Sequence, residues 1–236
     1  LQKQHKEAVS FYQALSTKKN HYLLRSSYKH LKGEKFLIDH LEQSEIKFRI
    51  FPDSFISPHI EQEENLYNYL FEQSLLKPQD KAIDFNADTG IFSLYLAKKI
   101  KMVYGFEENR FFIRDAVFNA RLNRLENALF FENSFNKEDI QKDILTESIQ
   151  AIFLKPSIRG LDEKTLAFLK EGSFNRVLYI HFSFETMQKD QEAILNLGYL
   201  FKGVKPFDIL PHTFHKVGVA VFEKKKKLKI KKNKKS

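Results

Sequence analysis

The sequence has 236 residues, 42% of them hydrophobic, and a formal net charge of +9, which suits one domain with an appendage. It contains no cysteine, which excludes disulfides, zinc–thiolate sites and cysteine nucleophiles and fits a reducing compartment, the cytoplasm or an organelle matrix. No apolar run is long enough to cross a bilayer, no signal-peptide pattern is present, and the start at Leu1 rather than Met suggests a fragment or a processed product.

The first elements form an expected N-terminal extension, residues 1–59. Ala8, Phe11, Tyr12 and Leu15 recur at helical spacing, which predicts an amphipathic helix within "KEAVSFYQALSTKK". A strand is expected at residues 46–51.

From about residue 60 to 223 the pattern alternates between helices and short apolar runs. Strands are expected at 81–85, 102–107, 128–132, 149–154, 175–182 and 217–223, with helices at 59–76, 91–100, 109–125, 162–170 and 185–198. This alternation predicts a doubly wound α/β domain with a mostly parallel sheet.

The last segment, residues 224–236, holds nine lysines, and without them 30 basic residues face 30 acidic ones (39 − 9 = 30). Such a run is expected to contact phosphates and gives candidate RNA-binding residues. These are Lys224, Lys225, Lys226, Lys227 and Lys229. A solvated tail and a targeting signal are the alternatives.

Three residues at expected strand ends are candidates for holding a nucleoside cofactor. Asp84 closes one strand, Gly90 lies in the loop that follows, and Glu107 closes the next strand, where an acid can accept hydrogen bonds from ribose hydroxyls. The G-x-G-x-x-G motif of nicotinamide sites is missing, so the pattern favours S-adenosylmethionine. The alternative is a helix start whose loop merely required a glycine.

Further stretches resemble the motifs of one family. In order, they are "GEKFLIDHLEQSEIKFRIFPDSF", "AIDFNADTGIFSLYLA", "VYGFEENRFFIRDAVFNARLNRLEN", "AIFLKPSIRGLDEKTLAFL", "RVLYIHFSFETMQKD" and "KPFDILPHTFHKVGVAVFEKK". They cover residues 33–224 and are similar to the RNA 5-methyluridine methyltransferases, which act on tRNA and rRNA. The resemblance implies a class I methyltransferase fold, S-adenosylmethionine as cofactor, RNA or a ribonucleoprotein as partner, and neither metal nor membrane. By the resemblance, we expect the family's RNA-binding N-terminal regions to be absent or reduced here.

The catalytic positions of that family are changed. Its enzymes add a cysteine thiolate to uracil C6, methylate C5, and remove the C5 proton with a general base. By the resemblance, the cysteine position is Phe182 and the base position is Val217. We therefore expect no catalytic residue in this chain.

Other departures fall on positions near the cofactor. By the resemblance, Lys155 replaces an acid, Ser157 and Ile158 replace Pro-Arg, Ser57 and His59 replace Gln and Asn, Asp88 replaces a glycine, and Ser134 replaces an acid. Asp84, Gly90 and Glu107 match, and so do Asn119 and Asn123. The added charge at Asp88 and the lost acid at Ser134 argue against retained cofactor binding.

Three further groups have plainer interpretations. His212 and His215 lack a third metal ligand at recognisable spacing, and His181 is expected to be a partly buried strand residue rather than a base.

Phe111, Phe112, Ala116 and Asn119 are expected to pack in the core. On the same helix, Arg110, Arg114, Arg121 and Arg124 are expected to face solvent, with phosphate as the alternative.

These patterns together predict a catalytically degenerate family member that serves as an RNA- or ribonucleoprotein-associated module. Two alternatives stay open: an active S-adenosylmethionine-dependent RNA methyltransferase with another target atom, and a structural interaction protein without cofactor.

Overall fold

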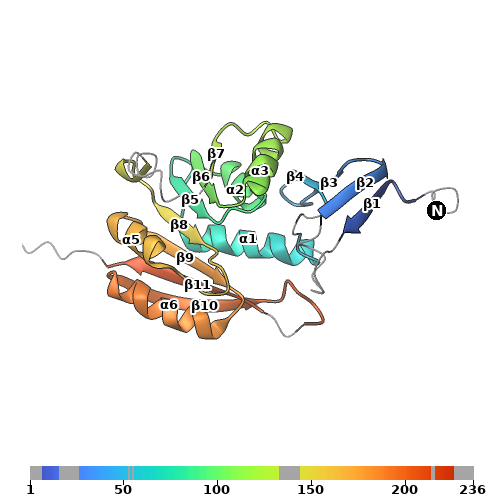
Figure 1. Ribbon diagram of the computed structural model, residues 1–236. Helices are drawn as coiled ribbons and strands as arrows, with labels where there is room; N and C mark the ends of the chain where they lie inside the picture. The colour runs from blue at the N-terminus through green and yellow to red at the C-terminus, as the bar shows by residue number, and fades with distance from the viewer. Residues whose placement is uncertain are drawn as a thin grey trace, which may run out of the picture.

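A computed structural model describes residues 7–15, 27–52, 54, 56–132, 144–213 and 216–225. Its centre is a seven-stranded sheet in the order β10-β11-β9-β8-β5-β6-β7 (Figure 1). The strands are β5 (Lys81–Phe85), β6 (Met102–Glu107), β7 (Ala128–Glu132), β8 (Ala151–Leu154), β9 (Arg176–His181), β10 (Tyr199–Phe207) and β11 (Val217–Lys224). The helices are α1 (Ile60–Ser74), α2 (Ile91–Ala97), α3 (Arg110–Leu122), α5 (Glu163–Glu171) and α6 (Phe184–Asn196).

The predicted doubly wound, mostly parallel sheet is confirmed. Strands β7, β6, β5, β8 and β9 pair in parallel, so their carboxyl ends share one edge. Strand β11 runs antiparallel to β9 and pairs Gly218 with His181 and Glu223 with Arg176. It therefore starts at the shared carboxyl edge and ends at the opposite edge.

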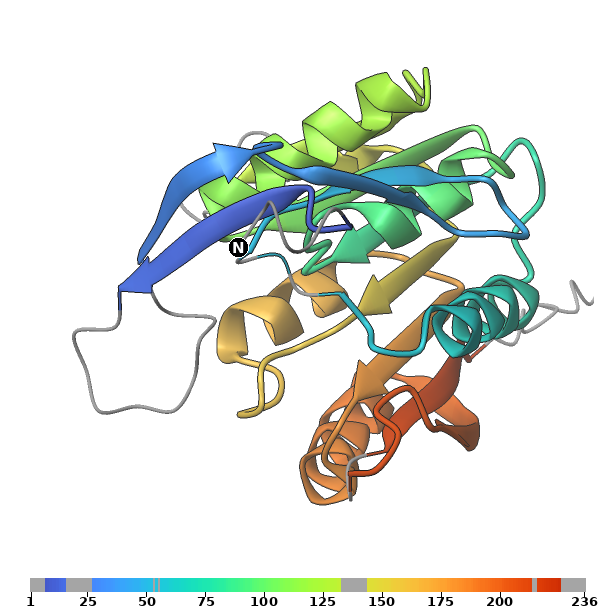
Figure 2. The ribbon, with the colours of Figure 1, turned by 90° about the vertical axis from the view of Figure 1, so that its right-hand side faces the viewer.

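Alternating strand residues build two cores, one on each face of the sheet. Ala82, Val103 and Phe153 pack with α1, α2 and α3. Ile83 and Ile152 face the other way and pack with α5 and α6. The strands are apolar on both faces because helices cover both faces (Figure 2).

The prediction of a helix within residues 6–19 is wrong. Residues Ser10–Leu15 form strand β1, which pairs antiparallel with β2 (Ser27–Gly33). Phe11 and Tyr12 suit a strand as well as a helix, and the pairing partner, more distant in the sequence, decides between the two. In Figure 1 this hairpin projects at the right of the molecule, away from α5 and α6.

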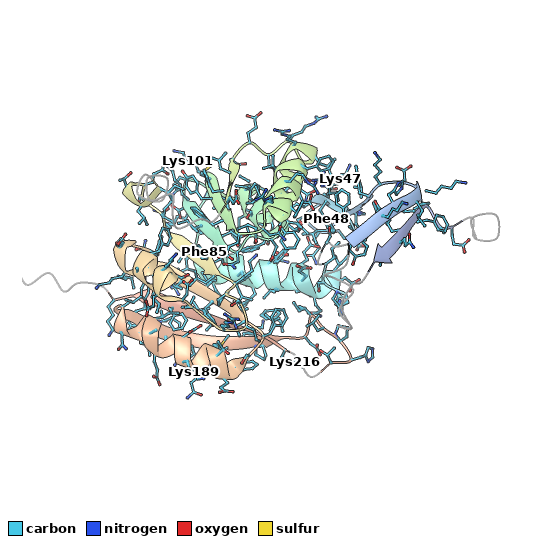
Figure 3. The ribbon with its side chains drawn as sticks, in the orientation of Figure 1. Lys47, Phe48, Phe85, Lys101, Lys189 and Lys216 are labelled. Carbon is cyan, nitrogen blue, oxygen red and sulfur yellow. The ribbon has the colours of Figure 1, made fainter. Side chains whose placement is uncertain are left out.

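A second hairpin joins the N-terminal residues to the main sheet's core. Strands β3 (Leu37–His40) and β4 (Lys47–Ile50) form an antiparallel pair, and Leu41, Ile46 and Phe48 are buried in the core shared with α1 and α2. Figure 3 places Phe48 between α1 and α3. The domain boundary near residue 59 stays a prediction.

Helix α3 departs from the sequence expectation at two positions. Ala116 and Asn119 are fully buried as expected, but Phe111 is 56% exposed, and Phe112 is only half-buried and belongs to neither core. Arg110, Arg114, Arg121 and Arg124 are exposed, as expected. Phe111 lies in the first turn of α3, and its ring centroid lies 5.6 Å from the Cζ of Arg114.

Candidate functional site

A cavity of about 240 Å³ lies at the carboxyl edge of the sheet. Four positions that the sequence motifs single out meet there: Asp88, Lys155, Phe182 and Val217. They come from the loop after β5, the end of β8, the end of β9 and the start of β11. The other walls are Glu63, Leu66, Tyr67, Leu70, Ala87, Thr89, Ile91, Phe92, Pro156, Ile180 and Ile209. The fold thus assembles the expected site from segments that are far apart in the sequence.

The two positions expected to carry nucleophile and base are apolar. Phe182 is 40% exposed, directly after β9, and Val217 is buried as the first residue of β11. Neither side chain can attack a carbon or accept a proton. This wall of the cavity offers hydrophobic contact and no covalent or acid–base chemistry.

The loop between β5 and α2 keeps a glycine-like backbone. Asn86, Asp88 and Gly90 have φ angles of +64°, +51° and +80°. A Cβ atom on Gly90 would lie 2.7 Å from the Ala116 Cβ and 2.8 Å from the Phe130 ring, so glycine is required there by packing as well as by φ. Asp88 retains a conformation that costs an L-residue about 1–2 kcal/mol.

Asp84, at the end of β5, is fully buried. Its Oδ2 accepts a 2.6 Å hydrogen bond from the Ser93 hydroxyl. Its Oδ1 has no hydrogen-bond partner and lies 3.4 Å from the Lys155 Nζ. The Lys155 ammonium thus supplies an opposite charge for this buried carboxylate.

Glu107, at the end of β6, accepts two backbone hydrogen bonds. Its Oε2 accepts from the Asp88 N–H and its Oε1 from the Asn109 N–H, each at 2.9 Å. Burial raises the pKa of Glu107. Its carboxylate therefore joins the first loop to the start of α3.

Lys155 reaches two carboxylates from the end of β8. Its Nζ lies 3.4 Å from the Asp84 Oδ1 and 3.6 Å from the Asp88 Oδ2. Burial by itself would lower the pKa of Lys155, but the charges of Asp84, Asp88 and Glu107 raise it above its usual value. The ammonium is therefore charged. Two departures from the family pattern, Asp88 and Lys155, thus pair with each other.

Helix α1 contributes a polar pair that sequence analysis missed. The Tyr67 hydroxyl donates a 2.5 Å hydrogen bond to the Glu63 Oε1. Burial raises the pKa of both groups. Their spacing of one helical turn was visible in the sequence, but only the cavity shows that both face a site.

His181 is buried and both ring nitrogens have partners, so it is poorly suited to be a base. The Ser183 N–H donates to Nδ1 at 2.8 Å, and Nε2 lies 2.9 Å from the Ser157 carbonyl oxygen. These contacts match a neutral ring with its proton on Nε2. His181 thus joins the turn after β9 to the loop after β8.

The other changed positions have structural contacts or face solvent. The Ser57 hydroxyl is buried and donates to the Ile209 carbonyl at 3.3 Å, and the His59 Nδ1 accepts from the Gln62 N–H at the start of α1. Ile158 is exposed. Ser134 and His215 lie outside the described residues, and His212 is exposed.

The lysine segment starts at the opposite edge of the sheet from the cavity. The Lys224 Nζ donates to the Leu197 carbonyl at 3.3 Å and lies 4.4 Å from the Tyr199 ring centroid. Lys225 is exposed, and the expected RNA-binding residues Lys226, Lys227 and Lys229 lie outside the described residues. Lys224 therefore packs against the fold.

A second cavity, of about 430 Å³, adjoins the first and shares Pro156 with it. Asn86, Glu108, Ser157 and Arg159 line it. Both cavities flank the loop after β5, where ligands bind in sheets of this topology. Within the described part of the chain, no group of three or more His, Asp or Glu could hold a metal ion and no helix could span a membrane.

Comparison with known proteins gives one family. Residues 3–226 match the family model described as tRNA (Uracil-5-)-methyltransferase. An uncharacterized RNA methyltransferase of Leptospira interrogans is 33% identical over 180 residues, which are 76% of this chain and 44% of that protein. Another, from Bacillus cereus, is 31% identical over 216 residues, 89% of this chain and 45% of the relative. The chain thus spans less than half the length of these relatives.

Solved structures share the fold. The tRNA (uracil-54, C5)-methyltransferase of Pyrococcus abyssi, in complex with S-adenosyl-L-homocysteine, superposes with a TM-score of 0.77 at 23% identity and covers 94% of this chain and 53% of that one. Trm5b from Pyrococcus abyssi superposes with a TM-score of 0.61 at 18% identity and covers 94% and 66%.

Proposed function

Because the chain belongs to the tRNA (uracil-5-)-methyltransferase family, we propose that it is a degenerate member that associates with RNA or a ribonucleoprotein and transfers no methyl group. The observation that carries this proposal is the pair Phe182 and Val217 in one cavity. Uracil C5 becomes nucleophilic only after a thiolate adds to C6, and the sequence has no thiol.

The family implies S-adenosylmethionine as the methyl donor, and in this chain the acidic residues at and beside the cavity also contact other groups of the protein. The carboxylates of Asp84 and Asp88 are already paired with Lys155. Glu107 uses both oxygens to accept from backbone N–H groups. Because Phe182 and Val217 supply neither a nucleophile nor a base, no methyl-transfer step is assigned to this site.

Two features support an RNA partner. The family is named for a tRNA-modifying activity. Exposed lysines occur on or beside the N-terminal strands at Lys29, Lys32, Lys35 and Lys47, and Figure 3 shows Lys47 on the side of the molecule that carries these strands. Together with the lysine segment at 224–236, they supply positive charge for phosphates at two places on the chain.

A methyl-transfer assay tests this proposal. The full chain is incubated with total RNA and isotopically labelled S-adenosylmethionine, and the nucleosides are analysed by mass spectrometry. We expect no labelled nucleoside above the level without protein. Labelled 5-methyluridine made by this chain would refute the proposal.

One observation favours a second candidate, methylation of an oxygen or ring nitrogen, which needs a proton acceptor but no thiol. Glu63 lines the cavity, and burial there raises its pKa. A carboxylate with a raised pKa is a better general base at neutral pH. The same assay decides, because this candidate predicts a labelled nucleoside other than 5-methyluridine.

A further inference from the structure

Helix α3 carries aromatic and arginine side chains in alternation along one face. Four of them recur at spacings of three and four residues, which places them on the same side of the helix. They are Phe111, Arg114, Phe118 and Arg121. Phe111 and both arginines are exposed, whereas the one acidic residue within α3, Asp115, is buried. This face of the helix is therefore positively charged.

The rings and guanidinium groups form a continuous stack that reaches the surface. The Arg49 Cζ lies 4.1 Å from the centroid of the Phe118 ring and 5.1 Å from that of Phe51. The Arg114 Cζ lies 5.6 Å from the centroid of the Phe51 ring and 5.6 Å from that of Phe111. Arg49 is buried, but the Arg114 side chain is 60% exposed and Phe111 is 56% exposed. The stack thus runs from the core to solvent and ends at Phe111.

The Arg114 guanidinium is held in place although it is exposed. Besides its two ring contacts, its Nη2 lies 3.5 Å from the Asp115 Oδ1. The same carboxylate forms the buried ion pair with Arg49, so two guanidinium groups share one carboxylate and the cluster keeps a net positive charge. A side chain that is already positioned loses less conformational freedom when a ligand binds. Arg114 is therefore a pre-organised cation.

Further basic side chains lie at both ends of this face. Arg110 begins α3, and exposed Lys47 lies at the other end, where its backbone N–H donates to the Asn123 Oδ1 at 2.9 Å (Figure 3). The exposed acids Glu108 and Glu126 lie outside the helix. An exposed ring among cations is complementary to a polyanion whose units have flat faces, and single-stranded RNA is such a polymer.

We propose that Phe111 and Arg114 form a stacking site for one base of single-stranded RNA, with the base on the Phe111 ring and the neighbouring phosphate on the Arg114 guanidinium. Unpaired bases stack on aromatic side chains, and the planar guanidinium matches the geometry of a phosphate. The RNA partner rests on the proposed function. The site is separate from the cavity, since neither residue lines it.

Fluorescence anisotropy of the full chain with a labelled single-stranded RNA of ~12 nucleotides, over a salt series, measures the stacking. Phe111→Ala should weaken binding by about tenfold, a difference of ~1.4 kcal/mol, at every salt concentration. Phe111→Tyr keeps the ring and should bind as wild type does. The matched control is Phe201→Ala, because Phe201 is also partly exposed but lies on β10, the outermost strand on the other side of the sheet from β7.

The salt series separates the base from the phosphate. Arg114→Gln should lower the slope of log affinity against log salt by about 0.7, the value for one neutralised phosphate of a single strand. Phe111→Ala removes no charge and should leave the slope unchanged. Lys189→Gln is the charge control, because Lys189 is exposed on α6, and its slope should equal that of wild type. Thermal denaturation verifies that each variant is folded.

Duplex RNA of the same sequence distinguishes stacking from general contact. Its bases already stack on one another, so Phe111→Ala should not change the affinity for the duplex. Equal affinities of wild type and Phe111→Ala for the single strand, or an equal loss for single strand and duplex, would overturn the stacking site. An unchanged slope for Arg114→Gln would overturn the phosphate contact.

These outcomes are separable from those of the proposed function. If wild type binds RNA and the Phe111 variants bind equally well, this site is refuted and the association with RNA stands. If wild type binds no RNA at low salt, both are refuted. A labelled nucleoside in the methyl-transfer assay refutes the non-catalytic role alone.

Discussion

The guanidinium of Arg49 on β4 forms a buried ion pair with the Asp115 carboxylate on α3. The Arg49 Cζ also lies 4.1 Å from the centroid of the Phe118 ring. The pair joins an N-terminal hairpin to the helix that follows β6, so it connects the residues before α1 to the methyltransferase-like sheet.

Breaking this pair should strongly destabilise the protein. Asp115→Ala leaves the Arg49 charge buried without a partner, which typically costs about 3–5 kcal/mol. Urea denaturation measures the free energy of unfolding. Arg114→Ala is the control, because Arg114 is exposed beside the same carboxylate and should cost less than about 1 kcal/mol. Equal losses of unfolding free energy in the two variants would show that the buried Arg49–Asp115 ion pair contributes no more to stability than the exposed Arg114.

Asn119 should be required for a second connection between the same hairpin and the cavity loop. Its Oδ1 accepts from the Arg49 N–H and its Nδ2 donates to the Thr89 carbonyl, each at 3.0 Å. Asn119→Ala leaves two buried backbone groups unsatisfied, at about 1–3 kcal/mol each. Asn123→Ala serves as the comparison, since Asn123 bonds the more exposed Lys47 backbone, where water can substitute. A smaller loss for Asn119→Ala than for Asn123→Ala in denaturation experiments would contradict this expectation.

The protein should be more stable with glycine than with alanine at position 88. Both Asp88→Gly and Asp88→Ala remove the ion pair with Lys155, but only glycine adopts a φ of +51° without strain. We expect Asp88→Gly to be more stable than Asp88→Ala by about 1–2 kcal/mol. Thermal and urea denaturation of the two variants provide the comparison. Equal stabilities would mean that the loop rearranges when the carboxylate is removed.

Glu63 should make stability depend on pH. Burial raises the pKa of Glu63 above its ordinary value of 4.5 in the folded protein. Its contribution is therefore fully present below pH 4.5 and is lost as the pH rises through the raised folded-state pKa. Glu63→Gln keeps an acceptor for the Tyr67 hydroxyl but cannot ionise, so its stability relative to wild type should increase over that pH range.

The measurement is the difference in free energy of unfolding between Glu63→Gln and wild type, from acidic to neutral pH. Glu61→Gln, on the same helix and exposed, is the matched control. A flat difference for Glu63→Gln would show that burial does not raise the pKa of Glu63.

The lysine segment should contribute to RNA affinity in a salt-dependent way. Deleting residues 226–236 leaves Lys224 and its interactions with Leu197 and Tyr199 in place, so the melting temperature should not change. The slope of log affinity against log salt should decrease by roughly 0.7–0.9 for each RNA phosphate that the deleted lysines neutralised. A length-matched Gly/Ser replacement separates charge from length. An unchanged slope would show that the segment does not bind RNA phosphates.

Much of the main sheet could be predicted because local patterns and fold agree there. The runs at 81–85, 102–107 and 128–132 are short, apolar and bounded by polar loops, and they match β5, β6 and β7 residue for residue. Strand β10 was not predicted. It is an edge strand whose side chains, except at its ends, are largely exposed, so no buried pattern marks it.

The candidate site was likewise predicted only in part from the sequence. Phe182 and Val217 were identified by matching motifs, and their lack of catalytic groups follows from residue type alone. Glu63 and Tyr67 were missed because a helical acid and a tyrosine one turn apart usually face solvent or core. The lysine segment was predicted as one unit, yet its first residue, Lys224, packs against Tyr199.

The amino-acid sequence by itself determined the fold class, the family and the absence of a thiol, because periodicity, motif order and composition are properties of the chain. Only the tertiary structure decided that Lys155 pairs with Asp84 and Asp88. The reason is physical: Coulomb interactions depend on distance in space, and the parallel strands bring the end of β8 against the loop after β5, although some 70 residues separate them in the sequence (155 − 84 = 71).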